Sequence, residues 1–598
     1  MRNSLLLLVM GLGVVFGQDS LNCRQIGSWP FGPAYAIALD TERNLVFLGS
    51  GYGVIVFDIT RPDSLVKISE AIKAKGEVQG LFYQANRLYV AADKAGLEIW
   101  DVNNPVSPVK LGSLTIPGAA LDVAVSDNYA YVAAETAGLR VISVAEPQNP
   151  VEVGYCDTPA EACAVAVVGD YAYVGDVYSA LRVISVSDPF DPVEVGCLQT
   201  PDGVLDVAVR GDYAYVADWE AGLRIVYISD PTNPVEVGYC LTPNIANGVA
   251  VSGDYAYVAN RDDGLRVILV SDPTNPVEVG HCNTAGSARN VGIYGDYAYV
   301  ADGYSGLRVI SISDPTNPYE VAFYVTTDWA YDVAVSGDYA YIAGGKCGLR
   351  IVSVAEPNSP VEVGYYDTPG LAYAVAVSQQ YCYVADEIDT VRIVSVEDPQ
   401  NPIELGCCYV HHPFNVVVSG DYAYVAAENA GLRIISVADP TNPYEVGYYD
   451  TPGLALGLAV GGDYAYVADW EAGLRVVSVS DPTNPVEVGC YNTPGYARNI
   501  VLKGDYAYVA DDNAGVRIIS VSNPTSPVEV GYYDTPGNAL DVAIAGDYLY
   551  VADLTDLRVI DVSDPRNPVE AGYYHTWAFC LSVADYAYVA TRGVGLRI

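Results

Sequence analysis

One segment recurs about every 42 residues along almost the whole chain. Each copy is marked by the first tyrosine of a Tyr-Ala-Tyr-Val-Ala motif or a close variant. These marker tyrosines are Tyr129, Tyr171, Tyr213, Tyr255, Tyr297, Tyr339, Tyr381, Tyr422, Tyr464, Tyr506, Tyr548 and Tyr586. Two divergent copies begin at Leu45 and Leu88, which brings the number of units to fourteen. A fixed period in this range is typical of β-propeller blades.

Each unit contains four short runs that are rich in Val, Ile and Tyr and are bounded by turn residues. The unit that begins at Gly462 predicts strands over 463–468, 474–480 and 486–491, and the run 497–502 opens the next unit. We name the strands A (innermost, opening a unit), B, C and D (outermost). Proline is confined to the turns, where it removes no ladder hydrogen bond. No run has a helical period long enough for a helix.

The alternation within Tyr-Ala-Tyr-Val (171–174) places two tyrosines on one face of a sheet and small residues on the other. One sheet cannot bury both faces alone, so the units must stack. We therefore expect an all-β fold, a β-propeller built from about fourteen four-stranded repeats. Because single rings usually hold four to eight blades, two seven-bladed rings are the natural division.

The same units resemble a known repeat. Within Leu-Arg-Val-Ile-Ser-Val-Ser-Asp-Pro, the run Leu181, Val183, Ile184, Val186 and Asp188 resembles the LVIVD repeat of bacterial and archaeal propeller-type proteins. The match recurs from Leu139 to the end of the chain, whereas the first two units, at 55–58 and 97–101, keep the strand and lose its arginine. The resemblance implies an extracytoplasmic propeller and transfers no catalytic residue.

The chain is expected to divide into three parts. Residues 1–17 read as a secretory signal peptide, with a positive start, an apolar stretch and a small-residue cleavage site; an uncleaved anchor is the alternative. Residues 18–326 and 327–598 are the predicted first and second propellers. The boundary is placed near Thr326, where the segment 319–330 departs from the pattern of its neighbours.

The two ends of the repeat region suggest how the last blade is completed. Residues 23–29 resemble a D strand, and the chain stops at Ile598 inside a C strand, so the last blade lacks the strand that the N-terminal segment offers. Strand exchange and a truncated gene remain equally open interpretations. Such a strand would join the first unit to the fourteenth, which leaves open that the second ring is inserted within the first. The nearest duplicate loops, at Ala217 and Ala468, also lie six units apart rather than seven.

The formal net charge is −43, and each unit contributes about three negative charges, so the acidity is spread around the fold. This distribution argues against nucleic acid, which needs a basic footprint, and against anionic membrane surfaces. Beyond the N-terminal stretch no apolar run approaches the length of a membrane span, and we expect no membrane insertion after signal cleavage. An acidic surface of this kind is compatible with high solubility, with cationic binding partners or with loosely held divalent ions.

Twelve cysteines in a chain with a signal peptide suggest disulfides. Several occupy equivalent positions of strand D, and equivalent positions in successive blades lie beyond disulfide reach. These are Cys156, Cys240, Cys282 and Cys408, with Cys197, Cys407 and Cys490 one residue earlier. We predict that the cysteines serve as small buried apolar residues, and without a Cys-x-x-Cys pair zinc is not expected.

The B–C and D–A loops vary between units, whereas the A–B and C–D turns hardly change. Variable loops on a constant scaffold mark the expected contact surface, the rim. Trp219 beside Glu220, and Trp470 beside Glu471, suggest aromatic platforms with an adjacent acceptor; rings that cover a blade edge are the alternative. The candidate ligand-binding residues are Trp219, Glu220, Trp470, Glu471, Tyr178, Tyr304, Asp262, Asp263, Glu387 and Asp389.

Other polar groups are assigned to structure. Four aspartates that open strand A could ring a channel mouth and hold calcium, although no calcium loop motif occurs; they are Asp122, Asp206, Asp332 and Asp541. The arginine of each Gly-Leu-Arg is predicted to pair with an aspartate of its own or the next blade. His411 and His412 are expected to face apart as consecutive residues. We predict no cofactor, no metal site and no catalytic residue.

The expected function is an exported or cell-surface repeat scaffold, in a secreted, periplasmic or surface location, that binds a protein or carbohydrate through the rim. A propeller-type polysaccharide hydrolase or lyase that uses rim carboxylates is the alternative, because carboxylate pairs are abundant. A purely structural surface array is a third possibility. A hydrolase would show a few deep carboxylates in one cleft, whereas a scaffold would present a broad, shallow face.

Overall fold

A computed structural model describes residues 23, 28–29, 31–177, 180–324, 330–356, 360–591 and 595–598. All regular secondary structure in this part of the chain is β-strand, arranged as fourteen four-stranded antiparallel sheets. The predicted signal peptide and the predicted boundary near Thr326 lie outside the described residues. No helix long and apolar enough to cross a membrane occurs among the described residues.

We number the sheets as blades in chain order, and blades 1 to 13 each run from A to D without a crossover. Blades 1 to 7 span 34–73, 80–114, 122–156, 162–199, 206–240, 248–282 and 290–324. Blades 8 to 13 span 332–366, 372–409, 415–449, 457–491, 499–533 and 541–575, and blade 14 combines 578–597 with residues 28–29.

The predicted strands agree closely with the observed ones. In the unit that begins at Gly462, β43 (Tyr464–Ala468), β44 (Leu474–Ser478) and β45 (Val486–Tyr491) lie within the predicted ranges. The next A strand, β46 (Asn499–Lys503), begins two residues later than predicted. The reason is that Ala497 pairs with the B–C loop of the preceding blade: its N–H donates to the Trp470 carbonyl at 3.1 Å.

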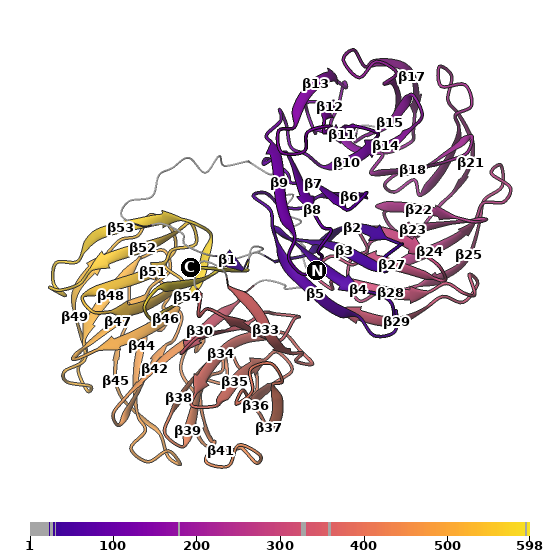
Figure 1. Ribbon diagram of the computed structural model, residues 1–598. Helices are drawn as coiled ribbons and strands as arrows, with labels where there is room; N and C mark the ends of the chain where they lie inside the picture. Colours follow the sequence, from indigo (N-terminus) through magenta and orange to yellow (C-terminus); the bar gives the residue numbers. More distant parts are fainter. Residues whose placement is uncertain are drawn as a thin grey trace.

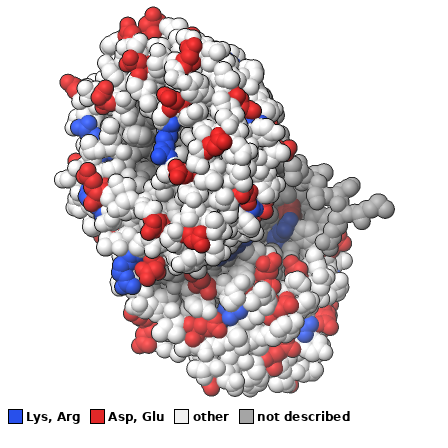
Figure 2. Space-filling view, turned by 90° about the vertical axis from the view of Figure 1, so that its right-hand side faces the viewer, with Lys and Arg blue, Asp and Glu red and all other residues white. Residues whose placement is uncertain are grey.

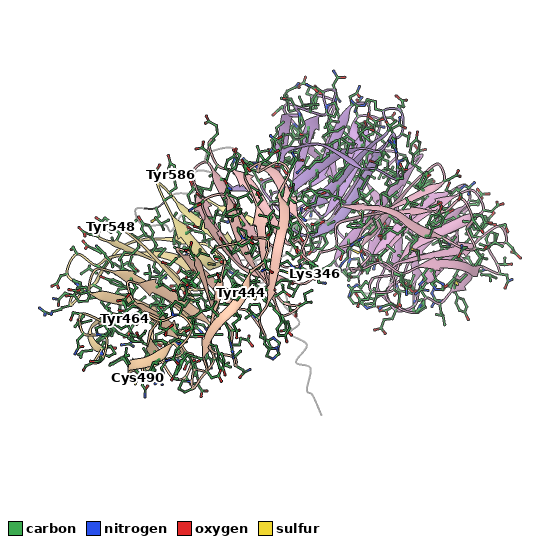
Figure 3. The ribbon with its side chains drawn as sticks, turned by 90° about the horizontal axis from the view of Figure 1, so that it is seen from below. Lys346, Tyr444, Tyr464, Cys490, Tyr548 and Tyr586 are labelled. Atoms are coloured by element: carbon green, nitrogen blue, oxygen red, sulfur yellow. The ribbon has the colours of Figure 1, made fainter. Side chains whose placement is uncertain are left out.

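Neighbouring blades pack a bulky face against a small one, as the alternation predicted. Tyr173 and Val183 of blade 4 pack against Ala214 and Val216 of blade 5 in one buried apolar cluster. The same kind of cluster recurs between successive blades. The marker tyrosines repeat their positions from blade to blade, and Figure 3 labels Tyr464, Tyr548 and Tyr586 among them.

Blades 1 to 7 form a continuous circuit of contacts, which we call the first array. Strand β2 (Ala34–Asp40) of blade 1 contacts both β6 (Gly80–Gln84) of blade 2 and β26 (Asn290–Tyr294) of blade 7. The Ala34 N–H donates to the Gly303 carbonyl at 2.8 Å, and Gly303 returns the bond at 3.1 Å. This is the same bridge that joins consecutive blades. Figure 1 shows the array in indigo to pink.

Blades 8 to 14 form the second array, drawn in pink to yellow in Figure 1. Strand β30 (Asp332–Ser336) contacts β34 (Ala372–Ser378) of blade 9 and β54 (Ala578–Val583) of blade 14. The outermost strand of blade 14 is β1 (Ser28–Trp29), which pairs antiparallel with β56 (Gly595–Arg597). The N-terminal segment thus supplies the missing strand. The nesting is the reverse of the alternative considered above: the first array is inserted between β1 and the rest of the second.

A lysine of blade 1 contacts the second array. Lys67 lies on β5 (Val66–Lys73), at the position where most blades carry glutamate, and Ile55 stands where they carry arginine. Ile55 carries no charge, so Lys67 has no ion-pair partner at that position. Its ammonium instead lies 2.9 Å from a Glu362 carboxylate oxygen of blade 8 and 3.6 Å from Glu70 of its own blade. The Tyr324 hydroxyl donates to Glu362 at 3.3 Å.

Lys67→Glu is expected to loosen this contact between the arrays. Glu362 and Glu70 keep only 3% and 7% of their side-chain surface exposed, so the variant would crowd three carboxylates where a cation now lies. We expect a larger radius of gyration in small-angle X-ray scattering and faster amide exchange in β33 (Val361–Tyr366). Lys75→Glu, at an exposed position, is the control. Scattering curves that coincide for both variants would contradict this role.

The surface charge follows the repeat. Figure 2 shows aspartate and glutamate scattered over the face in view, with few lysines and arginines between them. In the C–D turns these carboxylates accept local N–H groups, as where Thr274 donates its main-chain N–H to Asp272 at 3.0 Å. The acidity is therefore part of the repeating turn, as the sequence indicated.

Candidate functional site

The repeated arginines pair with carboxylates of their own blades. The Arg392 Nε lies 2.6 Å from Asp386, the last residue of strand B, and Nη1 lies 3.1 Å from Glu404 on strand D. Blade 2 carries the same pair with its charges exchanged, because Lys110 lies 2.6 Å from Glu98, which stands in the arginine position. The acidic and basic residues can exchange positions between blades. We therefore assign this ion pair a structural role in the blade.

The B–C and D–A loops lie on one face, where bridges such as Trp470–Ala497 connect each loop to the start of the next A strand. In the second array three consecutive blades place an aromatic residue just at that start: Tyr331, Tyr373 and Phe414. The Tyr331 and Tyr373 ring centroids lie 5.3 Å apart at 87°, and those of Tyr373 and Phe414 lie 6.0 Å apart at 26°. We call these three residues the aromatic row.

The aromatic row is partly open to solvent and has carboxylates beside it. Phe414 is 36% exposed, and both tyrosines are half-buried. Burial raises the pKa of Tyr373, and the charges of Glu387 and Glu428 raise it further. Glu387 is exposed in the B–C loop of blade 9, and Glu428 lies in that of blade 10. The row therefore combines apolar ring surface with hydrogen-bond acceptors.

Each of the two predicted tryptophan platforms has a guanidinium over its ring. The Arg261 guanidinium lies 5.4 Å from the Trp219 ring centroid. At Trp470, the Arg498 guanidinium lies 4.1 Å from the ring centroid, and the Tyr496 ring stacks at 4.6 Å and 15°. These partners come from the following loop and blade, so they cannot be read from the Trp-Glu pair itself. Glu220 and Glu471 are exposed.

The other candidate residues are distributed over several blades. Tyr304 is 37% exposed in blade 7, and Asp262 is exposed in blade 6. Asp263 instead lies 3.3 Å from Arg266 of its own blade. Glu387 adjoins the aromatic row, Asp389 contacts His411 and His412, and Tyr178 lies outside the described residues. Among the members of the predicted set that the structure describes, only Glu387 and Asp389 lie in a blade of the aromatic row.

The aspartates that open strand A connect neighbouring blades. Asp206 accepts the N–H of Val207 at 2.8 Å with one oxygen and that of Val249, in the next blade, at 2.8 Å with the other. Asp122 repeats this arrangement at the wall of a cavity of about 300 Å³ among the A strands of blades 2 to 5, otherwise lined by residues such as Leu81 and Val209. The carboxylate oxygens of Asp122 and Asp206, considered above as possible calcium ligands, thus accept main-chain hydrogen bonds.

The prediction that all cysteines are buried is wrong. Cys197, Cys407 and Cys490 are exposed, because they lie on strand D opposite the repeated arginine, where other blades place an outward tyrosine. Cys347, Cys382 and Cys408 are buried, and the remaining six are intermediate. The outer position of strand D tolerates either a thiol or a tyrosine because its side chain faces solvent.

The expectation that His411 and His412 face apart is also wrong. Their ring centroids lie 4.3 Å apart, because His412 adopts a left-handed φ of +49° that turns the chain within the D–A loop. Both contact Asp389: His411 Nδ1 lies 3.2 Å from Oδ1, and the His412 main-chain N–H donates to the same oxygen at 2.8 Å. Sequence spacing alone does not reveal this cluster, because the left-handed backbone conformation of His412 is what brings the two rings together.

Comparison with known proteins agrees with this architecture. The model of the family described as LVIVD repeat matches twelve consecutive segments. They are residues 75–115, 117–158, 159–200, 203–242, 244–284, 285–326, 329–368, 369–410, 414–451, 452–493, 494–535 and 536–576. A search of curated proteins found no match. Each matched segment corresponds to one blade, and the chain therefore belongs to the LVIVD-repeat family.

Proposed function

We propose that this propeller is an exported or cell-surface scaffold that binds a glycan at the aromatic row of the second array. The observation that supports the proposal is the contact of three aromatic rings from blades 8, 9 and 10 beside Glu387 and Glu428. Aromatic faces pack against the apolar face of a sugar ring, and carboxylates accept its hydroxyl groups. Such a site, largely apolar with a few polar groups, is typical of small-molecule recognition.

The second array supports this role better than the first. The first array has no such run of rings at the start of strand A. Its blades carry, in order, Tyr35, Gln79, Leu121, Cys163, Leu205, Asn247 and Arg289 at the equivalent positions. The acidic surface favours an uncharged or cationic ligand, because it would repel an anionic one. The extracellular location rests on the reading of residues 1–17 as a signal peptide.

A glycan-binding screen of the full chain with Tyr373→Ala tests the proposal. Tyr373 contacts both other rings of the row, and we expect its removal to weaken binding by at least about tenfold, equivalent to about 1.4 kcal/mol. Tyr373→Phe keeps the ring and should retain most of the affinity. Tyr304→Ala, at an exposed rim position of the first array, is the control.

Three results would contradict the proposal. The first is binding that Tyr373→Ala leaves unchanged, and the second is binding that Tyr304→Ala removes instead. The third is the absence of any glycan ligand, which would favour a protein ligand or a structural array. Cleavage of a bound polysaccharide would favour the hydrolase or lyase alternative, for which Glu387 and Glu428 are the first carboxylates to replace.

A further inference from the structure

We propose that Asp389, His411 and His412 form a binding site for a divalent transition-metal ion of the zinc class on the rim of blade 9. The inference goes beyond glycan binding and does not depend on it. Two loops build the site: Asp389 lies just before β36 (Thr390–Ser395), and both histidines follow β37 (Ile403–Tyr409). Because Thr390 pairs with Tyr409 at the end of this ladder, the two loops meet.

The geometry brings three ligand atoms together. One atom each from Asp389, His411 and His412 lies within 4.8 Å of the others. Zinc–ligand bonds of about 2.0–2.2 Å place ligand atoms about 3.3–3.6 Å apart, so a shift of about one ångström closes the set around an ion. The His411 side chain is 55% exposed and that of Asp389 30%, so an ion can reach both from solvent.

The chemistry of the three side chains selects the ion. Imidazole with carboxylate suits Zn²⁺, Cu²⁺ and Ni²⁺, whereas Ca²⁺ and Mg²⁺ require six or more oxygen ligands. The Asp389 carboxylate supplies an anionic oxygen ligand beside the two imidazoles. Three protein ligands leave a position open for water or for a ligand atom.

A second histidine–aspartate contact, in blade 13, already has a cationic side chain beside it and serves as a comparison. In blade 13 His575 Nδ1 contacts Asp556, but the Arg558 guanidinium contacts the same carboxylate, so a positive charge is already present. In blade 9 the repeated arginine, Arg392, pairs with Asp386 and Glu404 instead. No lysine or arginine ion pair to Asp389 occurs in the described part of the chain.

The test is a Zn²⁺ titration of the full chain by calorimetry after removal of metal with a chelator. We expect one tight site per chain, followed by weak binding to the acidic surface. His411→Ala/His412→Ala should abolish the tight phase and leave only the weak binding to the acidic surface. The control variant, His281→Ala/His575→Ala, removes the other two histidines of the chain and should bind as the wild type.

Two further measurements keep the result unambiguous. Co²⁺ in place of Zn²⁺ should give a visible absorption band with the wild type and with the control, but not with the double variant. The single variants His411→Ala and Asp389→Asn lie in solvent-exposed loops, and circular dichroism establishes that each folds. Equal Zn²⁺ titrations of the wild type and of folded His411→Ala and His411→Ala/His412→Ala variants would overturn the proposal, as would a wild type with weak binding only.

Discussion

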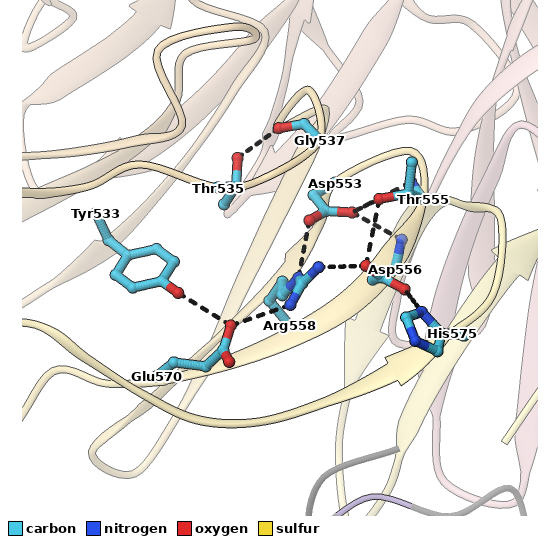
Figure 4. Close-up of polar contacts among 9 residues, drawn as sticks. All are labelled: Tyr533, Thr535, Gly537, Asp553, Thr555, Asp556, Arg558, Glu570 and His575. Atoms are coloured by element: carbon cyan, nitrogen blue, oxygen red, sulfur yellow. Dashed lines mark hydrogen bonds and ion pairs between the residues drawn. The ribbon is translucent and has the colours of Figure 1, made fainter. Parts of the chain in front are cut away.

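Replacing Arg558 by alanine should lower the free energy of unfolding by about 3–5 kcal/mol. The guanidinium contacts three carboxylates of blade 13 (Figure 4): Nε lies 2.9 Å from Asp553, Nη1 lies 3.1 Å from Glu570, and Nη2 contacts Asp556. Asp553 is fully buried, and Asp556 keeps 4% of its side-chain surface exposed. The alanine variant would leave these carboxylates without their guanidinium partner in a site that water reaches poorly.

The packing of the arginine adds to this loss. Its guanidinium lies 4.9 Å from the ring centroid of Tyr573, which the variant would also leave uncovered. Arg558→Lys keeps the charge but not the planar fork, so we expect an intermediate loss. Arg566→Ala removes an exposed arginine of the same blade and should change stability by less than about 0.5 kcal/mol.

Denaturant midpoints and amide exchange of blade 13 measure these differences. Local exchange is needed because arrays of repeats can open one unit at a time. We expect the fastest exchange of Arg558→Ala in β51 (Tyr548–Ala552), β52 (Asp556–Asp561) and β53 (Val569–His575). If Arg558→Ala unfolds at the same midpoint as Arg566→Ala, the ion pairs contribute nothing to the scaffold.

The sequence predicts the fold well because each unit repeats the same local signals. Period-two alternation, proline in the turns and the regular spacing of the marker tyrosines locate strands B, C and D to within about two residues. Strand A is the least accurate, because its first residues pair with the loop of the preceding blade, as Ala497 does with Trp470. Such a bridge depends on the stacking of blades and has no local sequence signature.

The candidate sites were harder to predict because each combines residues from different units. The aromatic row joins Tyr331, Tyr373 and Phe414, each separated from the next by one repeat. Alignment of the units at the start of strand A would have revealed it, whereas variability within the B–C loops pointed to Trp219 and Trp470. Their ring faces carry arginines from the next blade, so side-chain type alone did not indicate access to a ligand.

Asp206 gives the protein an expected pH dependence opposite to ordinary acid denaturation. Burial, followed by the charge of Asp122, raises the pKa of Asp206 to about 7, although the N–H groups of Val249 and Val207 act in the other direction. In the unfolded chain an aspartate has a pKa of about 3.9. Between these values the folded state holds a proton that the unfolded state has lost, so the stability contributed by the neutral form is present below about pH 4 and is lost as the pH rises through about 7.

The difference of about three pKa units corresponds to roughly 4 kcal/mol at most. Asp206→Asn is neutral at every pH and resembles the protonated side chain. We therefore expect the wild type to lose more stability than this variant between pH 5 and pH 8, measured as melting temperature at each pH. Asp212→Asn, in the exposed turn after β18 (Asp206–Arg210), should keep the slope of the wild type. If Asp206→Asn and the wild type share one slope, Asp206 is already ionised in the folded protein, and its two main-chain donors outweigh the cost of burial.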